Sequence, residues 1–188
     1  VVVAPGTPAG SYTLTYQICE VLNPLNCDTA IVTVPVGATA IVANDDAGTS
    51  VNGFVGGTAF TNVLTNDTLN GVAVVPSQVT TTFVSSTNPG VTLSGTNVVV
   101  APGTPSGSYT LTYQICEVLN PLNCDTAIVT VPVGATAIVA NDDAGTSVNG
   151  FVGGTAFTNV LTNDTLNGVA VVPAQVTTTF VSSTNPGV

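Results

Sequence analysis

The sequence repeats itself, and this repetition limits the possible folds more than any other feature. Residues 1–91 align with residues 98–188 at a period of 97 residues, and only two of the 91 aligned positions differ. Those differences pair Ala9 with Ser106 and Ser77 with Ala174. A period near 100 residues is typical of one domain per repeat, whereas a solenoid unit spans about 20–50 residues. The chain therefore holds about two domains' worth of sequence.

The charge of the chain is one-sided. It has no Lys, Arg or His and ten Asp and Glu residues, which gives a formal net charge of −10. Nucleic-acid binding depends on cations that neutralise phosphates, so this function is excluded. The same charge disfavours an anionic membrane surface, and no apolar run approaches the roughly 20 residues of a membrane helix. Each carboxylate must therefore be solvated, hydrogen-bonded or bound to a metal.

Strand signals dominate the pattern. Short runs rich in Val, Thr, Ile, Tyr and Phe alternate with clusters of Gly, Pro and Asn, and hydrophobic residues make up 44% of the chain. We expect seven strands in one complete repeat: Ala47–Val51, Thr58–Leu64, Val79–Ser85, Val91–Ser94, Asn97–Ala101, Ser108–Cys116 and Cys124–Val133. Seven short strands in about 100 residues predict an all-β chain of tandem seven-stranded immunoglobulin-like β-sandwiches in a linear array.

The last two strands of each repeat have the clearest alternation. In the first copy one face carries Tyr12, Leu14, Tyr16 and Ile18, and the inward face of the next strand carries Ala30, Val32, Val34 and Val36. Period-2 patterning with one polar face predicts an antiparallel sheet that is covered on one side. We expect the two strands to form a hairpin around Glu20–Asn26.

The strand pattern also predicts domain boundaries. Residues 1–41 are the C-terminal part of one repeat, residues 42–138 are a complete repeat, and residues 139–188 are the N-terminal part of the next. The connector Gly37–Val42 is short, so neighbouring domains should keep a fairly fixed orientation. The start Val1–Ala4 has neither Met nor a basic signal-peptide region, so we expect a slice of a larger chain.

Each copy carries one pair of cysteines, Cys19 with Cys27 and Cys116 with Cys124. Both members lie on the outward face of adjacent strands, within disulfide reach. A zinc site would need four ligands, and the chain has no His and no CxxC pair. The spacing therefore predicts a disulfide in each copy and an oxidising compartment.

The acidic residues suggest a metal site. In a seven-stranded sandwich the five acids of the complete repeat should gather at one end, at the junction with the preceding domain. Hard oxygen ligands at such a junction suit Ca²⁺. The predicted ligands are Asp45, Asp46 and Asp67, with Asn44 and Asn66 as helpers, and Asp142, Asp143 and Asp164 in the next copy. The alternative is that these Asn and Asp residues stabilise local turns through their own backbone bonds.

Catalysis has little support in this composition. No His can act as a base, no Lys or Arg can stabilise an oxyanion, and the cysteines are expected to be paired. A two-carboxylate glycosidase is the one remaining mechanism, and a catalytic site copied along an array of small sandwiches is a poor candidate. We therefore expect that the chain is not an enzyme.

Several motifs carry a family likeness. Ala43–Asp46 followed by Val63–Thr68 resembles the "ANDD … VLxNDT" signature of bacterial immunoglobulin-like and cadherin-like tandem repeats. Gly107–Cys116 and Cys124–Ala127 are similar to the closing strands of such repeats in surface proteins of gliding bacteria. The resemblance implies large secreted or cell-surface proteins, often adhesins, with spacer domains and calcium at their junctions. The Asp-Thr-apolar pattern also resembles O-glycosylation sites of gliding bacteria, at Thr29, Thr68, Thr126 and Thr165.

These features favour a mechanical function. The leading hypothesis is an extracellular stalk or fibre shaft on the bacterial surface, with neighbouring repeats of the same chain as partners. The alternatives are a repeat that assembles with identical chains into a filament or surface layer, and a carbohydrate-binding adhesin module. Carbohydrate sites favour aromatic platforms, and the chain has no Trp and only four Tyr residues.

Overall fold

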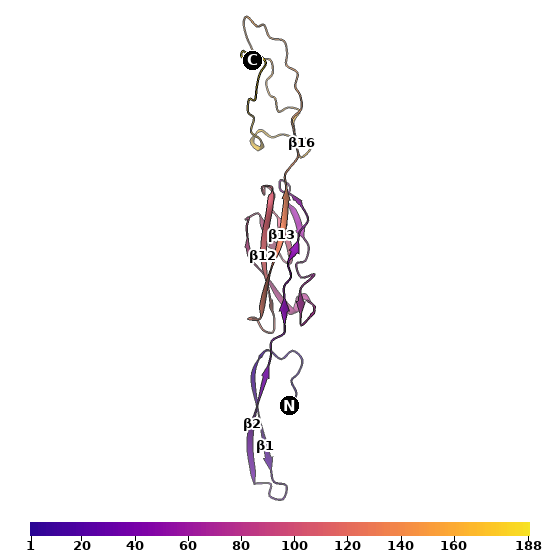
Figure 1. Cartoon of the computed structure of the whole chain (residues 1–188), viewed down its shortest axis with the longest axis vertical. Helices are drawn as coiled ribbons and strands as arrows, with labels where there is room; N and C mark the ends of the chain where they lie inside the picture. Colours follow the sequence, from indigo (N-terminus) through magenta and orange to yellow (C-terminus); the bar gives the residue numbers. More distant parts are fainter. The chain divides into compact units, whose positions relative to one another are not determined.

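The complete copy of the repeat folds into two facing β-sheets (Figure 1). A computed structural model describes all residues, 1–188, and divides them into two compact units, Val1–Gly134 and Ala135–Val188. The larger sheet of the complete copy consists of β4 (Asp46–Ala47), β5 (Val51–Asn52), β13 (Cys124–Gly134), β12 (Gly107–Glu117) and β9 (Val79–Ser86). The facing sheet consists of β6 (Gly57–Phe60), β11 (Asn97–Val100) and β10 (Val91–Ser94).

A third, small sheet lies at the start of this domain. It contains β3 (Ile41–Val42), β7 (Thr68–Leu69) and β8 (Val72–Ala73), and a 3-10 turn, η1 (Pro76–Gln78), leads into β9. With β4 and β5 counted as one interrupted strand, the two main sheets contain seven strands. The prediction of an all-β, immunoglobulin-like β-sandwich is therefore confirmed for the complete copy.

The antiparallel pair β12–β13 is the longest in the domain. Its register runs from Gly107 opposite Val133 to Cys116 opposite Cys124. As the alternation in the sequence predicts, every second side chain of each strand points toward the facing sheet. Leu111, Tyr113 and Ile115 on β12 are fully buried. Burial of one such aliphatic side chain contributes about 1.5–3 kcal/mol, so this stripe is a large part of the core.

Two predicted strands differ from the structure. The expected strand Ala47–Val51 is interrupted, because Gly48 N–H donates to Thr130 O while the next residue, Thr49, donates to Ala59 O of the facing sheet. A Cβ atom at Gly48 would lie 3.1 Å from Thr130 O, so this crossing between sheets favours glycine. Both short pieces, β4 and β5, pair parallel with β13.

The expected strand Thr58–Leu64 also ends early, at Phe60. Asn62 adopts a positive φ of 61°, which turns the backbone out of the strand. Val63 and Leu64 are nevertheless buried, because the backbone returns and Val63 N–H donates to Thr96 O. The hydrophobic signal in this segment therefore reported burial correctly and strand length incorrectly.

The N-terminal residues form a hairpin with no second sheet over it. It consists of β1 (Gly10–Cys19) and β2 (Cys27–Val36), which pair in the same register as β12 and β13 (Figure 1). Its inward-facing residues have identical counterparts that are buried in the complete copy. In the hairpin they are exposed or half-buried, because no second sheet packs on this face.

The unit Ala135–Val188 contains little strand. Its only strands are β14 (Ile138–Val139), β15 (Thr165–Leu166) and β16 (Val169–Ala170), with a 3-10 turn, η2 (Pro173–Gln175). The residues equivalent to β4, β5, β6 and β9 are not strands here. In the complete copy these strands pair with β11, β12 and β13, and this unit has no equivalent of those three. The tandem linear array and its boundaries stay predictions.

The proposed domain frame can be tested with two segments of equal length. Ala38–Gly134 and Val1–Asn97 each have 97 residues and are circular permutations of one sequence, apart from Ala9 in place of Ser106. In the complete copy Ala43 contacts Asp125 while Gly134 lies beside Asn52, so the two ends are separated by most of β13, about 30 Å.

A direct peptide link cannot span that distance within one sandwich. Ala38–Gly134 should therefore unfold in one cooperative thermal transition, and Val1–Asn97 at low concentration should not. Equal cooperativity of the two segments by calorimetry would show that this domain frame is wrong.

Candidate functional site

All five acidic side chains of the complete copy are associated with one stretch of backbone. We call residues 39–46 the lead-in segment, because this stretch leads from the preceding hairpin into the first strands of the sandwich. Two acids belong to it, and the other three accept hydrogen bonds from it. The five are Asp45, Asp46, Asp67, Glu117 and Asp125.

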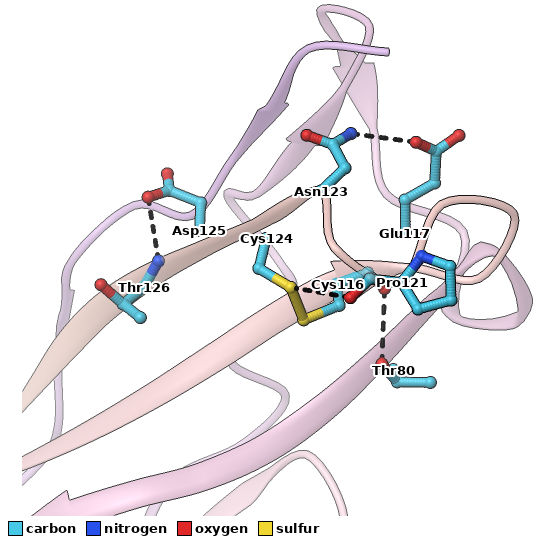
Figure 2. The surroundings of a disulfide bond; sticks show 8 residues. All are labelled: Thr80, Cys116, Glu117, Pro121, Asn123, Cys124, Asp125 and Thr126. Atoms are coloured by element: carbon cyan, nitrogen blue, oxygen red, sulfur yellow. Dashed lines mark hydrogen bonds between the residues drawn. A yellow bond between two sulfur atoms is a disulfide. The ribbon is translucent and has the colours of Figure 1, made fainter. Parts of the chain in front are cut away.

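Glu117, at the end of β12, binds the start of the lead-in segment. Its Oε1 accepts a hydrogen bond of 3.0 Å from the hydroxyl of Thr39. Its Oε2 accepts a bond of 2.8 Å from the amide of Asn120. The same oxygen accepts a bond of 2.9 Å from the amide of Asn123 (Figure 2). Burial alone would raise the pKa of Glu117, but the donors Asn123, Asn120 and Thr39 outweigh it and lower the pKa. The carboxylate is therefore ionised, and it binds the lead-in segment through one oxygen and the hairpin loop through the other.

Two further bonds attach the middle of the lead-in segment to β13. Ala43 N–H donates to Asp125 Oδ2 at 2.9 Å. In the opposite direction, Ile128 N–H donates to Asp45 Oδ1 at 2.8 Å. These carboxylates take the place of backbone acceptors, since regular ladder pairing with β13 begins only at Asp46. The lead-in segment is thus fixed to the sandwich before the first strand starts.

Asp67 is the most buried of the five acids, with no exposed surface. Its Oδ1 accepts a 2.8 Å bond from Asn44 N–H. The hydroxyl of Tyr113 lies 3.1 Å from each of its oxygens, and also 3.0 Å from Val63 O and 3.2 Å from Asn44 O. The single hydroxyl hydrogen of Tyr113 cannot be donated to four acceptors at once. A proton bound to the Asp67 carboxyl group would supply a second donor and so reduce the excess of acceptors. Burial raises the pKa of Asp67 in the same direction.

Asp46 has the least satisfied side chain in the domain. It is 8% exposed, and its Oδ2 is buried without a hydrogen-bond partner. Burial first, and then the negative charge of Asp67, raise the pKa of Asp46 to about 6. Two neighbouring buried carboxyl groups without a cation favour at least one bound proton. Asp46 and Asp67 are therefore an electrostatically coupled pair.

The predicted three-aspartate metal site does not form in this arrangement. Asp46 and Asp67 are neighbours, but Asp45 is bonded to the β13 backbone, and no group of three acidic, His or Cys side chains is placed to hold a metal. The equivalents Asp142, Asp143 and Asp164 are not grouped either. The residues as placed do not fit a Ca²⁺ site, and calcium binding stays a prediction.

Asn44 and Asn66 bond to each other's backbone. Asn44 Nδ2 donates to Asn66 O at 2.7 Å, and Asn66 Nδ2 donates to Asp45 O at 3.1 Å. The same bonds recur in the unit Ala135–Val188, where Asn141 Nδ2 donates to Asn163 O and Asn163 Nδ2 donates to Asp142 O. These bonds form without the closing strands, but each joins residues 21 or 22 positions apart, so they link two segments of the repeat and are not bonds within a local turn.

The cysteines are joined within each copy. Cys19 is bonded to Cys27, Cys116 is bonded to Cys124, and no cysteine is free. Each bond closes the hairpin at its loop end. In the complete copy the disulfide lies beside the Asn123–Glu117 hydrogen bond (Figure 2). The disulfide therefore also keeps in place the loop that supplies donors to Glu117.

The four threonines of the Asp-Thr-apolar pattern differ in accessibility. Thr29 and Thr126 are exposed, whereas Thr68 and Thr165 are half-buried. The exposed side chain of Thr126 lies at the surface of β13. The backbone N–H of the same residue donates to Asp125 Oδ1 at 2.9 Å (Figure 2). O-glycosylation of these residues stays a prediction.

Sequence reasoning missed several residues that hold the lead-in segment. Thr39, Asn120 and Asn123 lie in a connector and a loop, where polar residues are expected without any specific contact. The alternation pattern places Tyr16, the counterpart of Tyr113, on one face of a strand, but the contact of the Tyr113 hydroxyl with Asp67 joins two segments 46 positions apart. The one available signal was the lack of cations, which requires that buried carboxylates find uncharged donors.

Comparisons with known proteins give little beyond the general architecture. No protein-family model and no curated protein matches the sequence. The protocadherin gammaB4 extracellular domain is similar in structure at a TM-score of 0.32 and 16% identity, over 68% of this chain and 23% of that one. The protocadherin gammaB7 EC3-6 cis-dimer structure gives 0.32 and 15%, over 74% and 36%. The chain thus spans about a third or less of these proteins, and the likeness gives no information on binding. No helix in the structure is long and apolar enough to cross a membrane.

The raised pKa of Asp46 predicts how stability depends on pH. Its ordinary pKa is 3.8 and its folded pKa is about 6, so between these values only the folded state keeps the proton. The stabilisation by this proton is complete below about pH 4 and is lost as pH rises through 6. A pKa difference of this size between the folded and unfolded states corresponds to about 3 kcal/mol at most.

Asp46→Asn should therefore flatten the fall in unfolding free energy between pH 4 and 7. Denaturant titrations across this range measure the slope. Asp28→Asn, in the N-terminal hairpin, removes the same charge outside the sandwich and should leave the slope unchanged. An equal slope in Asp46→Asn and the unmodified chain would contradict the account.

The disulfides allow a matched test of stability. Replacement of both Cys116 and Cys124 by Ser should lower the unfolding free energy of the sandwich by about 2.5 kcal/mol, because the unfolded loop is no longer closed. Replacement of Cys19 and Cys27 should leave the same transition unchanged, since their hairpin lies outside the sandwich core. Chemical denaturation of both variants measures the difference, and equal losses would be the contrary result.

Proposed function

We propose that this chain is a structural repeat of an extracellular stalk or fibre shaft on the bacterial surface. The observation that carries the proposal is the fixed lead-in segment. β2 of the preceding copy ends at Val36, and Thr39 is already bonded to Glu117 of the next domain. Only Gly37 and Ala38 lie between these anchored positions. A tether this short restricts bending between consecutive repeats, as a shaft requires.

A second contact at the same junction supports the proposal. Ala9 N–H, just before β1, donates to Asn120 Oδ1 in the loop of the complete copy at 2.6 Å. Pro8 and Ala9 line a shared groove with the loop Leu119–Asn123. The hairpin loop of one repeat thus contacts the base of the preceding hairpin. The same loop supplies the amide donors of Glu117, so one loop restrains both the lead-in segment and the neighbouring copy.

The compartment and the lack of catalysis are inferred from chemistry. Disulfides persist in oxidising environments, which supports an extracellular location. The resemblance of the repeat motifs to bacterial surface proteins supports placement on a bacterial cell. The chain has no His, Lys or Arg, and its acids serve as acceptors for the lead-in segment, which supports a non-enzymatic role.

One observation favours the alternative of a multi-chain filament or surface layer. Phe83, Val84 and Ile128 on the larger sheet are between 41% and 50% exposed. Exposed apolar side chains on a sheet without positive charges do little to prevent lateral contact between chains. The carbohydrate-binding alternative has no such support, because the hydroxyl of Tyr113 is buried against Asp67.

The proposed function is tested by electron microscopy of a polypeptide with many consecutive repeats. Straight threads one domain wide are expected, with frequent bends after every Glu117 equivalent is replaced by Ala. Replacement of every equivalent of Thr130, an exposed β13 side chain, by Ala is the matched control and should keep the threads straight.

Bends at every junction of the unmodified polypeptide would contradict a shaft. Thicker fibres that contain several chains would instead support the filament alternative. The predicted calcium is tested by imaging the threads in calcium and again after chelation. Threads that bend only after chelation would support calcium at the junction. Threads that stay unchanged would show that calcium does not stiffen the junction.

A further inference from the structure

The chain enters and leaves the complete sandwich at opposite ends of two neighbouring segments. We call residues 43–53 the entry segment, because they carry the chain from the lead-in segment through β4 and β5. At its start, Ala43 N–H donates to Asp125 near the start of β13. At its end, Gly53 N–H donates to Gly134 O at the end of β13. The entry segment and β13 therefore run side by side in the same direction.

The bonds between these two segments follow one another along their length. The backbones pair in parallel over β4, with Asp46 opposite Val129, and again over β5. Between these two pieces, Gly48 N–H donates to Thr130 O at 2.8 Å. Parallel pairing gives evenly spaced, slanted bonds. The two segments are thus joined by a row of bonds and not by a single contact.

Two carboxylates extend this row beyond the backbone pairing. Ile128 N–H donates to Asp45 Oδ1 at 2.8 Å, and Ala43 N–H donates to Asp125 Oδ2 at 2.9 Å. One carboxylate belongs to each segment, so each segment supplies an acceptor to the other. Hydrogen bonds to an ionised acceptor are roughly twice as strong as bonds between neutral groups. The row is therefore reinforced at the end where the chain enters the sandwich.

Tension along the chain loads this row of bonds in shear. A pull toward the N-terminus acts on the entry segment at Ala43, and a pull toward the C-terminus acts on β13 at Gly134. Because the segments are parallel and are pulled from opposite ends, they must slide past each other. All bonds of the row then have to break together, whereas a pull on one end of both segments would break them one at a time.

We propose that the entry segment and β13 form the force-bearing clamp of the repeat, in which Asp45 and Asp125 are load-bearing hydrogen-bond acceptors. This inference rests on the proposed function in one respect, because a shaft carries tension along its chain. Resistance to forced unfolding is governed by the unfolding rate and not by equilibrium stability. The bonds of the clamp therefore have a larger effect on unfolding under force than equally strong bonds elsewhere in the sandwich.

The test is force spectroscopy of the full 188-residue chain, held by its two ends at constant force. The chain contains one complete sandwich, so one force-resistant unfolding step is expected. Asp45→Ala removes the acceptor of Ile128 N–H and should speed this step about tenfold, the effect of one hydrogen bond to a charged group. Asp45→Asn keeps an oxygen acceptor and should restore most of the resistance.

Thr87→Ala is the matched control, because it removes a bond of the same kind outside the clamp. Thr110 N–H on β12 donates to Thr87 Oγ1, just after β9, at 2.9 Å. Bonds that are still intact in the transition state do not change the unfolding rate. Thr87→Ala should therefore lower the unfolding free energy in denaturant, as Asp45→Ala does, and leave the unfolding rate under force unchanged. The denaturant transitions also show that both variants fold.

Three results would overturn the clamp. The first is an unfolding rate under force that Asp45→Ala leaves unchanged. The second is equal acceleration by Asp45→Ala and Thr87→Ala, which would reduce the role of Asp45 to general stability. The third is extension of the sandwich without a force-resistant step. The straightness of threads in electron microscopy depends on none of these results, so failure of the clamp is distinguishable from failure of the proposed shaft.

Discussion

The pairing of β12 with β13 is the interaction on which the rest of the sandwich depends. β4 and β5 are strands because β13 lies beside them, and β9 is a strand because it pairs with β12. The unit Ala135–Val188 demonstrates this dependence, since the same residues form no strand where the closing hairpin is absent. The small sheet β3–β7–β8 recurs there as β14–β16 and so needs only the first half of the repeat, whereas β4, β5 and β9 depend on the closing hairpin.

A second constraint is the absence of positive charge. A chain without cations cannot pair a buried carboxylate with an ammonium or guanidinium group, so amides, hydroxyls and backbone N–H groups serve as donors instead. Four of the five acids in the complete copy use such bonds to hold the lead-in segment. Asp46 Oδ2 is the exception and has no partner, and burial first and then the charge of Asp67 raise the pKa of this residue. The junction is thus polar and ordered without any ion pair.

The sequence predicted most of the fold, because alternation along β12 and β13 is strict and the cysteines lie opposite each other at the loop end. It failed where a backbone torsion decides the outcome, as at Asn62, and where two sheets compete for one strand, as at Gly48. The candidate site was harder to predict. The five acids were expected to gather at one end, but their hydrogen-bond donors lie in loops or come from distant strands. The carboxylates that suggested a metal accept backbone and side-chain hydrogen bonds in the structure, and calcium binding itself stays a prediction.

The central claim is that one sequence folds only when both halves of the repeat are present. Two-dimensional NMR of the dilute, monomeric chain tests it directly, because the repeated sequence contains its own control. We predict widely dispersed, slowly exchanging amide signals for Leu111, Tyr113 and Ile115, and separate, rapidly exchanging signals for their counterparts Leu14, Tyr16 and Ile18. Coincident signals with equal protection in the two copies would contradict the account, because each hairpin would then be equally ordered without its covering strands.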